Sequence, residues 1–128
     1  MTSCVLLMQQ GIKNDMTNSR QKGKRGELEV VHLLQQHGYE ARRGQQFKGT
    51  ADSPDVIHNL PGFFIEVKLR QQLNLHATIE KAQQEIAKAT GETPIVFHRK
   101  NGKPWLVTMT AEDFFKTIKE LYDDRQET

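Results

Sequence analysis

The chain has 128 residues, a formal net charge of +2 and 36% hydrophobic residues. This length suits a single domain that buries about two-thirds of the surface its unfolded chain exposes. One cysteine and five histidines give neither a disulfide framework nor the paired spacing of structural zinc. The early apolar run from Cys4 to Met8 is too short for a signal-peptide core or a membrane span, so we expect a cytoplasmic protein without a membrane partner.

The charge is distributed unevenly along the chain. Residues 1–48 carry eight bases against four acids, whereas residues 111–128 carry six acids against three bases. The basic end is therefore a candidate nucleic-acid face. Charge alone fits a solvated, lysine-rich helix start equally well.

The first predicted element is a helix. Residues 1–18 lack a sustained period and predict a flexible arm, ahead of a single domain over residues 19–128. From about residue 20 to 37 apolar side chains recur at helical spacing, and Gly38 stands where such a helix ends.

Two glycines interrupt the start of this helix. Gly23 and Gly26 each weaken it by up to about 1 kcal/mol relative to alanine, and they would let another part of the chain approach closely. A short strand at residues 39–43 follows. Residues 44–53, "GQQFKGTADS", then predict a loop of a length that is often functional.

Two hairpins are predicted, with a helix between them. The segments "PDVIH" and "FFIEVKL" flank a turn at residues 59–62 and predict an antiparallel pair. Residues 76–90 predict an amphipathic helix. The segments "PIVFHRK" and "KPWLVTM" flank Asn101-Gly102, the strongest short hairpin signal.

Thr110, with Asp113 three residues later, predicts the start of a last helix. Its apolar side chains are expected to form a core stripe; they are Phe114, Phe115, Ile118, Leu121 and Tyr122. The predicted fold is α/β, with element order αβββαββα and a central mixed sheet flanked by helices.

The strand "FIEVKL" carries an acid and a base on one face. Its apolar residues fall on the other face, so a solvated, ion-paired Glu66–Lys68 surface is the simplest interpretation. If the first hairpin pairs His58 with Phe63, however, Asp55 lies directly opposite Glu66. Two carboxylates about 5 Å apart repel each other, so this register favours a cation between them.

A third acid joins this pair. Glu27 shares its helix face with apolar residues that should pack on the sheet, and a buried carboxylate is costly unless it is paired or metal-bound. Glu29 lies on the more polar side and is predicted to be solvated. Carboxylates without histidine or cysteine form an oxygen-rich site that suits Mg²⁺ or Mn²⁺.

Pro54-Asp55, separated by ten intervening residues from Glu66-Val67-Lys68 and preceded by a helix with Glu27, resembles the PD-(D/E)xK nuclease superfamily. The segments "KGKRGELEVVHLLQQHGY", "PDV" and "IEVK" most resemble archaeal-type Holliday junction resolvases and related phage-encoded endonucleases. The resemblance covers about residues 20–109. It implies a restriction-endonuclease-like core and a homodimer that cuts symmetric strands of a four-way DNA junction.

The resemblance also implies residue roles. Asp55, Glu66 and the Val67 carbonyl would bind Mg²⁺, which Mn²⁺ could replace; Glu27 would be a further acidic member and Lys68 the catalytic lysine. The DNA phosphates would be bound by basic residues; these are Lys22, Lys24, Arg25, Arg42, Arg43, Lys48 and Arg70.

We therefore expect a magnesium-dependent DNA endonuclease acting on branched DNA in recombination or repair. Two alternatives remain open at this point. One is another PD-(D/E)xK nuclease that nicks DNA or cuts flaps or duplex, and the other is a non-catalytic DNA-binding module with the same fold.

Overall fold

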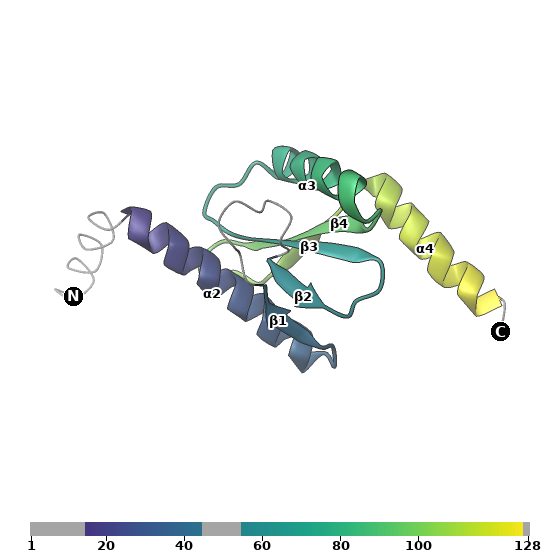
Figure 1. The fold of residues 1–128 in the computed structure, drawn as a ribbon, viewed down its shortest axis with the longest axis horizontal. Coiled ribbons are helices and arrows are strands. Elements are labelled where there is room, and N and C mark those ends of the chain that lie inside the picture. Colours follow the sequence, from purple (N-terminus) through teal and green to yellow (C-terminus); the bar gives the residue numbers. More distant parts are fainter. Residues whose placement is uncertain (1–14, 45–54, 127–128) are drawn as a thin grey trace.

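The computed structural model describes residues 15–44 and 55–126. Figure 1 shows the fold. The elements in chain order are α2 (Asp15–Gln36), β1 (Ala41–Arg43), β2 (Val56–His58), β3 (Phe63–Leu69), α3 (Leu75–Ala89), β4 (Thr93–Arg99), β5 (Leu106–Thr108) and α4 (Ala111–Gln126). The predicted order αβββαββα is confirmed. Helix α2 begins within the range predicted for the arm, and residues 45–53 of the predicted loop lie outside the described residues.

The central sheet has the strand order β3-β4-β5 and is mixed, as predicted. Strands β3 and β4 are parallel over seven residues, from Phe63 opposite Thr93 to Leu69 opposite Arg99. Strand β5 pairs antiparallel with β4, which confirms the second hairpin. Gly102 in its turn has a φ of 75°, a backbone conformation that glycine adopts without strain.

The prediction that β2 and β3 form a hairpin is wrong. Strand β2 pairs antiparallel with β1 instead, with Arg42 opposite Ile57. A hydrogen bond from Asn59 N to Glu40 O extends this pair. Strand β3 finds a longer partner in β4, which pairs with it over seven residues and is itself buried at its four central apolar residues. The chain therefore reaches its best strand partner through the α3 crossover and not through the nearest turn.

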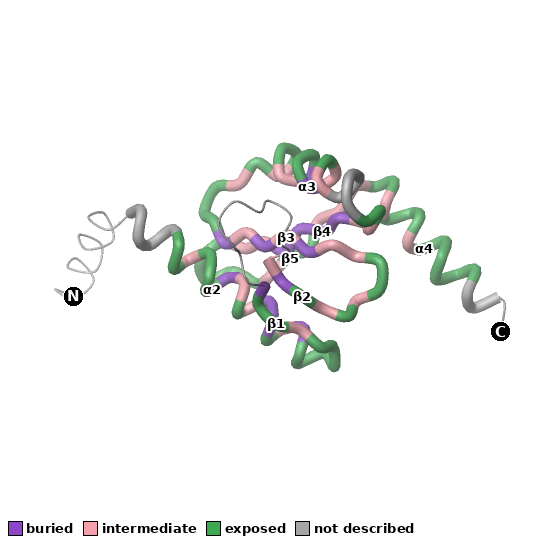
Figure 2. The backbone as a smooth tube through the Cα atoms, viewed as in Figure 1, coloured by how far each residue is buried: buried purple, intermediate pink, exposed green. Residues whose placement is uncertain are grey.

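Helices cover the sheet from two sides (Figure 1). Alternation along β3 buries Ile65 and Val67, which pack with Val30 and Val31 of α2. Val96 of β4 is also fully buried, and α3 packs on this strand with Ile79 and Ala82 buried. Figure 2 shows that burial concentrates in the middle of the sheet and on the inner face of α2. The alternation predicted for β3 is confirmed.

Gly26 permits the close approach of α2 to β3. A Cβ at this position would lie 3.1 Å from the Leu69 Cβ and 3.5 Å from Val67 Cγ1. At Gly23 a Cβ would meet nothing within 4 Å. Only Gly26 therefore has the packing role expected for a helix glycine, and it holds the adjacent Glu27 against the sheet.

Helix α4 starts as predicted, because the Asp113 amide donates to Thr110 Oγ1 at 3.2 Å. The prediction that its apolar stripe is core is wrong. Phe115 is 68% exposed, and the rest of the stripe is also exposed; these residues are Phe114, Ile118, Leu121 and Tyr122. Helix α4 projects away from the sheet (Figures 1 and 2), so the sheet of the same chain does not cover this stripe.

Candidate active site

Glu66 and Lys68 lie side by side on the polar face of β3. The period of two that buries Ile65 and Val67 places both charged groups on the opposite face. Lys68 Nζ lies 3.2 Å from Glu66 Oε1, and the two side chains are 25% and 20% exposed. The ion pair expected from the sequence is present. Because it is largely removed from water, it is more than a solvated surface pair.

Asp55 reaches the same site by a different route from the predicted one. It precedes β2, and the Gly44 amide donates to its carbonyl at 2.9 Å, which ties this residue to the end of β1. The pKa of Glu66 is raised by burial and by the charge of Asp55, and is lowered by Lys68. Asp55 and Glu66 are therefore close enough to interact, although the strand register that predicted this is wrong.

Glu27 approaches from α2 and is held by Arg43 of β1. Arg43 Nε donates to Glu27 Oε2 at 2.5 Å, and the Glu27 side chain is only 13% exposed. Burial raises the pKa of Glu27, the Arg43 hydrogen bond lowers it, and the charge of Asp55 raises it again. Lys68 also contributes to lowering this pKa. Asp55 and Lys68 thus act on both glutamates, which places three acids and one lysine around the outer side of β3.

The donor set fits a hard cation. The carboxylates of Glu66 and Glu27 both have pKa values raised by burial and by the negative charge of Asp55. A divalent cation would offset this concentration of negative charge, and oxygen ligands suit Mg²⁺. Within residues 15–44 and 55–126, no three acidic, histidine or cysteine side chains converge tightly enough to form a complete metal-binding group. The protein would have to complete the site with main-chain, solvent or substrate oxygens.

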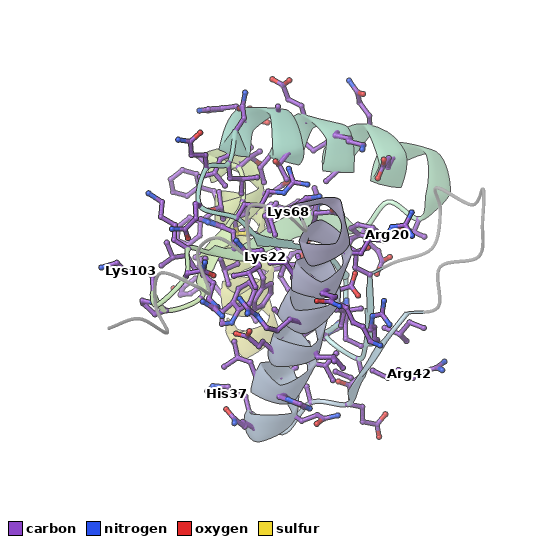
Figure 3. All side chains as sticks on the ribbon, turned by 90° about the vertical axis from the view of Figure 1, so that its left-hand side faces the viewer. Arg20, Lys22, His37, Arg42, Lys68 and Lys103 are labelled. Carbon is purple, nitrogen blue, oxygen red and sulfur yellow. The ribbon has the colours of Figure 1, made fainter. Side chains whose placement is uncertain are left out.

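Figure 3 views the molecule toward the N-terminal half of α2, which carries Lys22. Arg42 on β1 and Lys103 in the turn after β4 mark the two sides of this view, with Lys68 between them. Lys24, Arg42 and Arg70 are exposed. Two predicted phosphate-binding residues have protein partners, because Arg43 contacts Glu27 and Arg25 lies 3.5 Å from Glu29. Lys48 lies outside the described residues.

Comparison with known proteins decides the family. The profile of the archaeal Holliday junction resolvase family, Hjc, matches residues 18–126. The chain belongs to the Hjc family. Family membership makes it a nuclease that acts on DNA.

The fold agrees with a solved Hjc structure. The protein from Archaeoglobus fulgidus, a Holliday junction resolvase from an archaeal hyperthermophile, superposes with a TM-score of 0.52 at 21% sequence identity. The match covers 66% of this chain and 74% of that one, and at this identity it establishes the fold alone. A search of curated proteins finds no match. In this Hjc-family chain, no described helix is both long and apolar enough to cross a bilayer.

Glu29 of this Hjc-family chain is not the solvated residue that its position predicts. Arg99 Nη2 donates to its two carboxylate oxygens at 2.7 and 2.9 Å, and Arg99 Nε donates at 3.0 Å. Trp105 Nε1 also contacts it, at 3.3 Å. The network joins α2 to β4 and to the segment before β5. The local sequence around Glu29 does not indicate this network, because Arg99 is 70 residues away along the chain.

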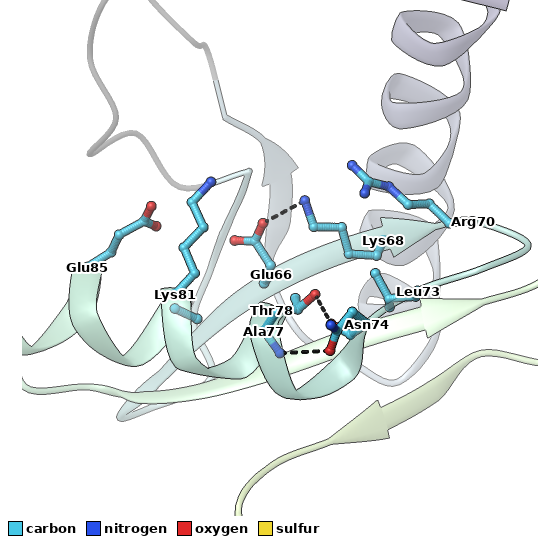
Figure 4. A pocket seen from close by; sticks show the side chains of 10 residues that line it. Glu66, Lys68, Arg70, Leu73, Asn74, Ala77, Thr78, Lys81 and Glu85 are labelled. Atoms are coloured by element: carbon cyan, nitrogen blue, oxygen red, sulfur yellow. Dashed lines mark hydrogen bonds and ion pairs between the residues drawn. The ribbon is translucent and has the colours of Figure 1, made fainter.

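A second missed feature is the wall that α3 forms beside the polar face of β3. A hollow of about 280 Å³ lies there, and Thr78 and Lys81 of α3 line it together with Glu66 and Lys68 (Figure 4). The helix pattern of residues 76–90 predicts an amphipathic helix without indicating that part of its polar side faces the site. The Hjc-family site is therefore a groove with α3 as one wall.

Proposed function

We propose that this protein is a magnesium-dependent endonuclease that resolves Holliday junctions as a homodimer. The observation that carries the proposal is the position of Asp55, which interacts electrostatically with Glu66 and Glu27 beside Lys68. Family membership supports a nuclease acting on branched DNA. The group of acids and a lysine supports hydrolysis at this place on the fold.

The acids would hold the metal ion. Asp55 and Glu66, with the main-chain carbonyl of Val67, would be its protein ligands, and Glu27 would be a further acidic member. When bound, Mg²⁺ polarises a phosphodiester and lowers the pKa of a water molecule. Burial on β3 supports this role for Glu66, because a rigid strand holds its carboxylate in one place.

Lys68 would act directly on the substrate. An ammonium group has three donors, and Glu66 accepts one contact at 3.2 Å. The remaining donors are free to bind a phosphodiester oxygen and to neutralise negative charge that develops there during attack by water. The Glu66 contact keeps the ammonium on the polar face of β3, where the groove opens.

Basic residues around the groove would position the DNA. Basic residues on α2, on β1 and after β3 support binding to several phosphates, which orients DNA without reading bases; the candidates are Lys22, Lys24, Arg25, Arg42, Arg43 and Arg70, together with Lys48, which lies outside the described residues. Each phosphate contact contributes about −0.9 to the slope of log affinity against log salt concentration. We therefore expect affinity to depend on junction structure and to fall steeply with salt.

The homodimer follows from the reaction. Resolving a junction takes two cuts, and each chain supplies one group of Glu27, Asp55, Glu66 and Lys68. The exposed stripe of α4 supports a second copy as its cover, because an isolated helix of this length gains little stability in water. Two copies would bring two sites to one junction.

A cleavage assay tests the function. Four-way junction, flap and linear duplex of equal length are incubated with Mg²⁺ or with chelator. Paired symmetric cuts are expected on the junction, and Asp55→Asn and Lys68→Ala should each reduce the rate by about a hundredfold or more. Asp123→Asn and Lys119→Ala, exposed on α4, are the matched controls and should cut at the wild-type rate.

Each other outcome has a clear meaning. Equal cutting of all three substrates would replace the resolvase with a general nuclease. Junction binding without cutting would make the protein a binding module. Undiminished cutting by Asp55→Asn or Lys68→Ala would place the chemistry elsewhere.

A further inference from the structure

The hollow between β3 and α3 has a strongly charged lining. Its volume is about 280 Å³. Glu66, Lys68 and Arg70 come from β3 and the residue after it, and Lys81 and Glu85 come from α3. Three bases against two acids leave a positive balance, and this surplus suits a phosphate-bearing ligand.

The position of Lys81 is fixed by the way α3 is anchored. Asn74 caps the helix by accepting from the Ala77 amide at 3.1 Å, and Thr78 Oγ1 donates to the Asn74 carbonyl at 2.8 Å. Ile79 and Ala82 are buried against the sheet. With the helix held at both its start and its inner face, Lys81 is directed along the groove wall.

Lys81 lies on the other side of Glu66 from Lys68 (Figure 4). The tips of Lys81, Lys68 and Arg70 point the same way, out of the groove. Lys68 forms an ion pair with Glu66. Lys81 forms no ion pair with any residue that the structure describes, even though Glu85 follows it by one helical turn and lines the same hollow. A solvated helix lysine would be unremarkable on the outer face of α3. Lys81 instead faces the candidate active site.

The spacing of these basic side chains matches the spacing of phosphates along a nucleic-acid strand. Residues two apart on a strand are about 6.6 Å apart. Neighbouring phosphates of one DNA strand are separated by roughly the same distance, because the backbone winds around the helix axis and the separation exceeds the axial rise of about 3.4 Å. Lys68 and Arg70 would therefore meet successive phosphates of one DNA strand that runs along β3. Lys81, on the other side of Glu66, would meet the phosphate before Lys68. Glu66, which lies between Lys81 and Lys68 in Figure 4, would lie under the scissile phosphate together with Lys68.

We propose that Lys81 binds a phosphate next to the scissile one, on the opposite side from Arg70, so that the strand to be cut runs along β3 against the wall of α3. This inference rests on the proposed function and specifies the path of its substrate. Lys81 is a phosphate-binding residue in this account, and its role depends on its charge.

Binding to junctions with single neutralised phosphates tests the path. One junction carries a methylphosphonate one phosphate 5′ of the cut site, and another carries it one phosphate 3′. Affinity is measured by fluorescence anisotropy with chelator present, so that cutting does not interfere. The proteins are wild type, Lys81→Ala, Lys81→Arg and Arg70→Ala, with Lys119→Ala as the matched control on α4.

Lys81→Ala should weaken binding to the unmodified junction about fivefold to tenfold, and Lys81→Arg and Lys119→Ala should bind like wild type. One of the two methylphosphonates should weaken junction binding by wild type by the same factor, and it should not weaken junction binding by Lys81→Ala any further. The other methylphosphonate should likewise weaken binding by wild type and not weaken binding by Arg70→Ala any further. Such paired losses identify direct partners, because independent contacts add.

Two results would overturn the proposed path of the DNA strand along β3. One is unchanged affinity of Lys81→Ala, and the other is an equal loss by wild type and Lys81→Ala on both modified junctions. Circular dichroism of Lys81→Ala, which should melt like wild type because Lys81 is exposed, excludes loss of fold. If wild type binds junctions without cutting them, the proposed function fails while the phosphate assignment is still decided by affinity.

Discussion

Arg43 Nε lies 2.5 Å from Glu27 Oε2, joining the middle of the first helix to the strand that follows it. Glu27 is 13% exposed and Arg43 is 40% exposed, so the acid is the more buried partner. The contact holds Glu27 beside Asp55 and lowers its pKa against the effect of burial. Arg43 thus favours the ionised form of a largely buried acid beside the candidate metal site.

Replacing Arg43 by alanine should destabilise the protein by about 1–2 kcal/mol. This is less than the 3–5 kcal/mol typical of a broken, fully buried pair, because solvent reaches the arginine. The pKa of Glu27 should rise further. Urea unfolding at neutral pH measures the loss, and Arg42→Ala, its exposed neighbour on β1, should change stability by less than about 0.5 kcal/mol. Equal losses in both variants would show that the ion pair contributes nothing.

Glu66 should make the metal-free protein less stable at neutral pH than it would be with a neutral side chain. Its pKa is raised in the folded chain by burial and by Asp55, so the folded state holds the proton more tightly than the unfolded state does. Ionisation above the raised pKa therefore costs stability, and the cost disappears below the ordinary glutamate pKa of about 4.3.

With chelator present, Glu66→Gln should therefore melt at a higher temperature than wild type at pH 7. The difference should shrink as the pH falls through the raised pKa and vanish near pH 4. Glu120→Gln, exposed on α4, should follow wild type throughout. A Glu66→Gln variant that is less stable at pH 7 would mean that the Lys68 ion pair outweighs burial.

The two glycines of α2 should respond in opposite ways to substitution. Gly23→Ala should stabilise the protein by about 0.5–1 kcal/mol, because the new Cβ meets nothing within 4 Å and alanine favours a helix. Gly26→Val should destabilise it by about 1–3 kcal/mol, since its Cβ would lie 3.1 Å from the Leu69 Cβ. Urea titration compares them. A tolerated valine would contradict the close packing of α2 on β3.

The exposed stripe of α4 should control assembly. Phe115→Ser should shift the protein toward monomer in analytical ultracentrifugation, with at least about a tenfold rise in dimer dissociation constant, because Phe115 is a large apolar side chain at 68% exposure. Lys116→Ser, exposed on the opposite side of the same helix, is the control and should leave assembly unchanged. A wild-type protein that is monomeric at all concentrations would remove the homodimer from the proposed function.

Local features of the sequence predicted most of the elements and the key strand. The alternation of Ile65 and Val67 with Glu66 and Lys68 gives both the buried side of β3 and the polar side that faces the groove. Glycine at position 102 gives the second hairpin, since few other residues adopt its φ of 75°. These signals are local, so neighbouring residues are enough to read them.

Long-range partners could not be predicted in this way. Which strand pairs with β3 depends on the seven-residue match with β4, formed only after the chain has passed through α3. The Arg99 partner of Glu29 lies 70 residues further along the chain, so helix position alone suggested solvent. Lys81 has the same local pattern as any surface lysine. Its place in the groove comes from how α3 packs on β4.

The parallel pairing of β3 with β4 has a consequence for how the protein reaches its active form. A parallel pair cannot close through a tight turn, so β3 gains this partner only when residues 70–92 have crossed back over the sheet. Contacts between residues distant in sequence form slowly. Because α3 is both the crossover and the wall of the groove, the site should be assembled late in folding, and a nascent or partly unfolded chain should lack the means to cut DNA.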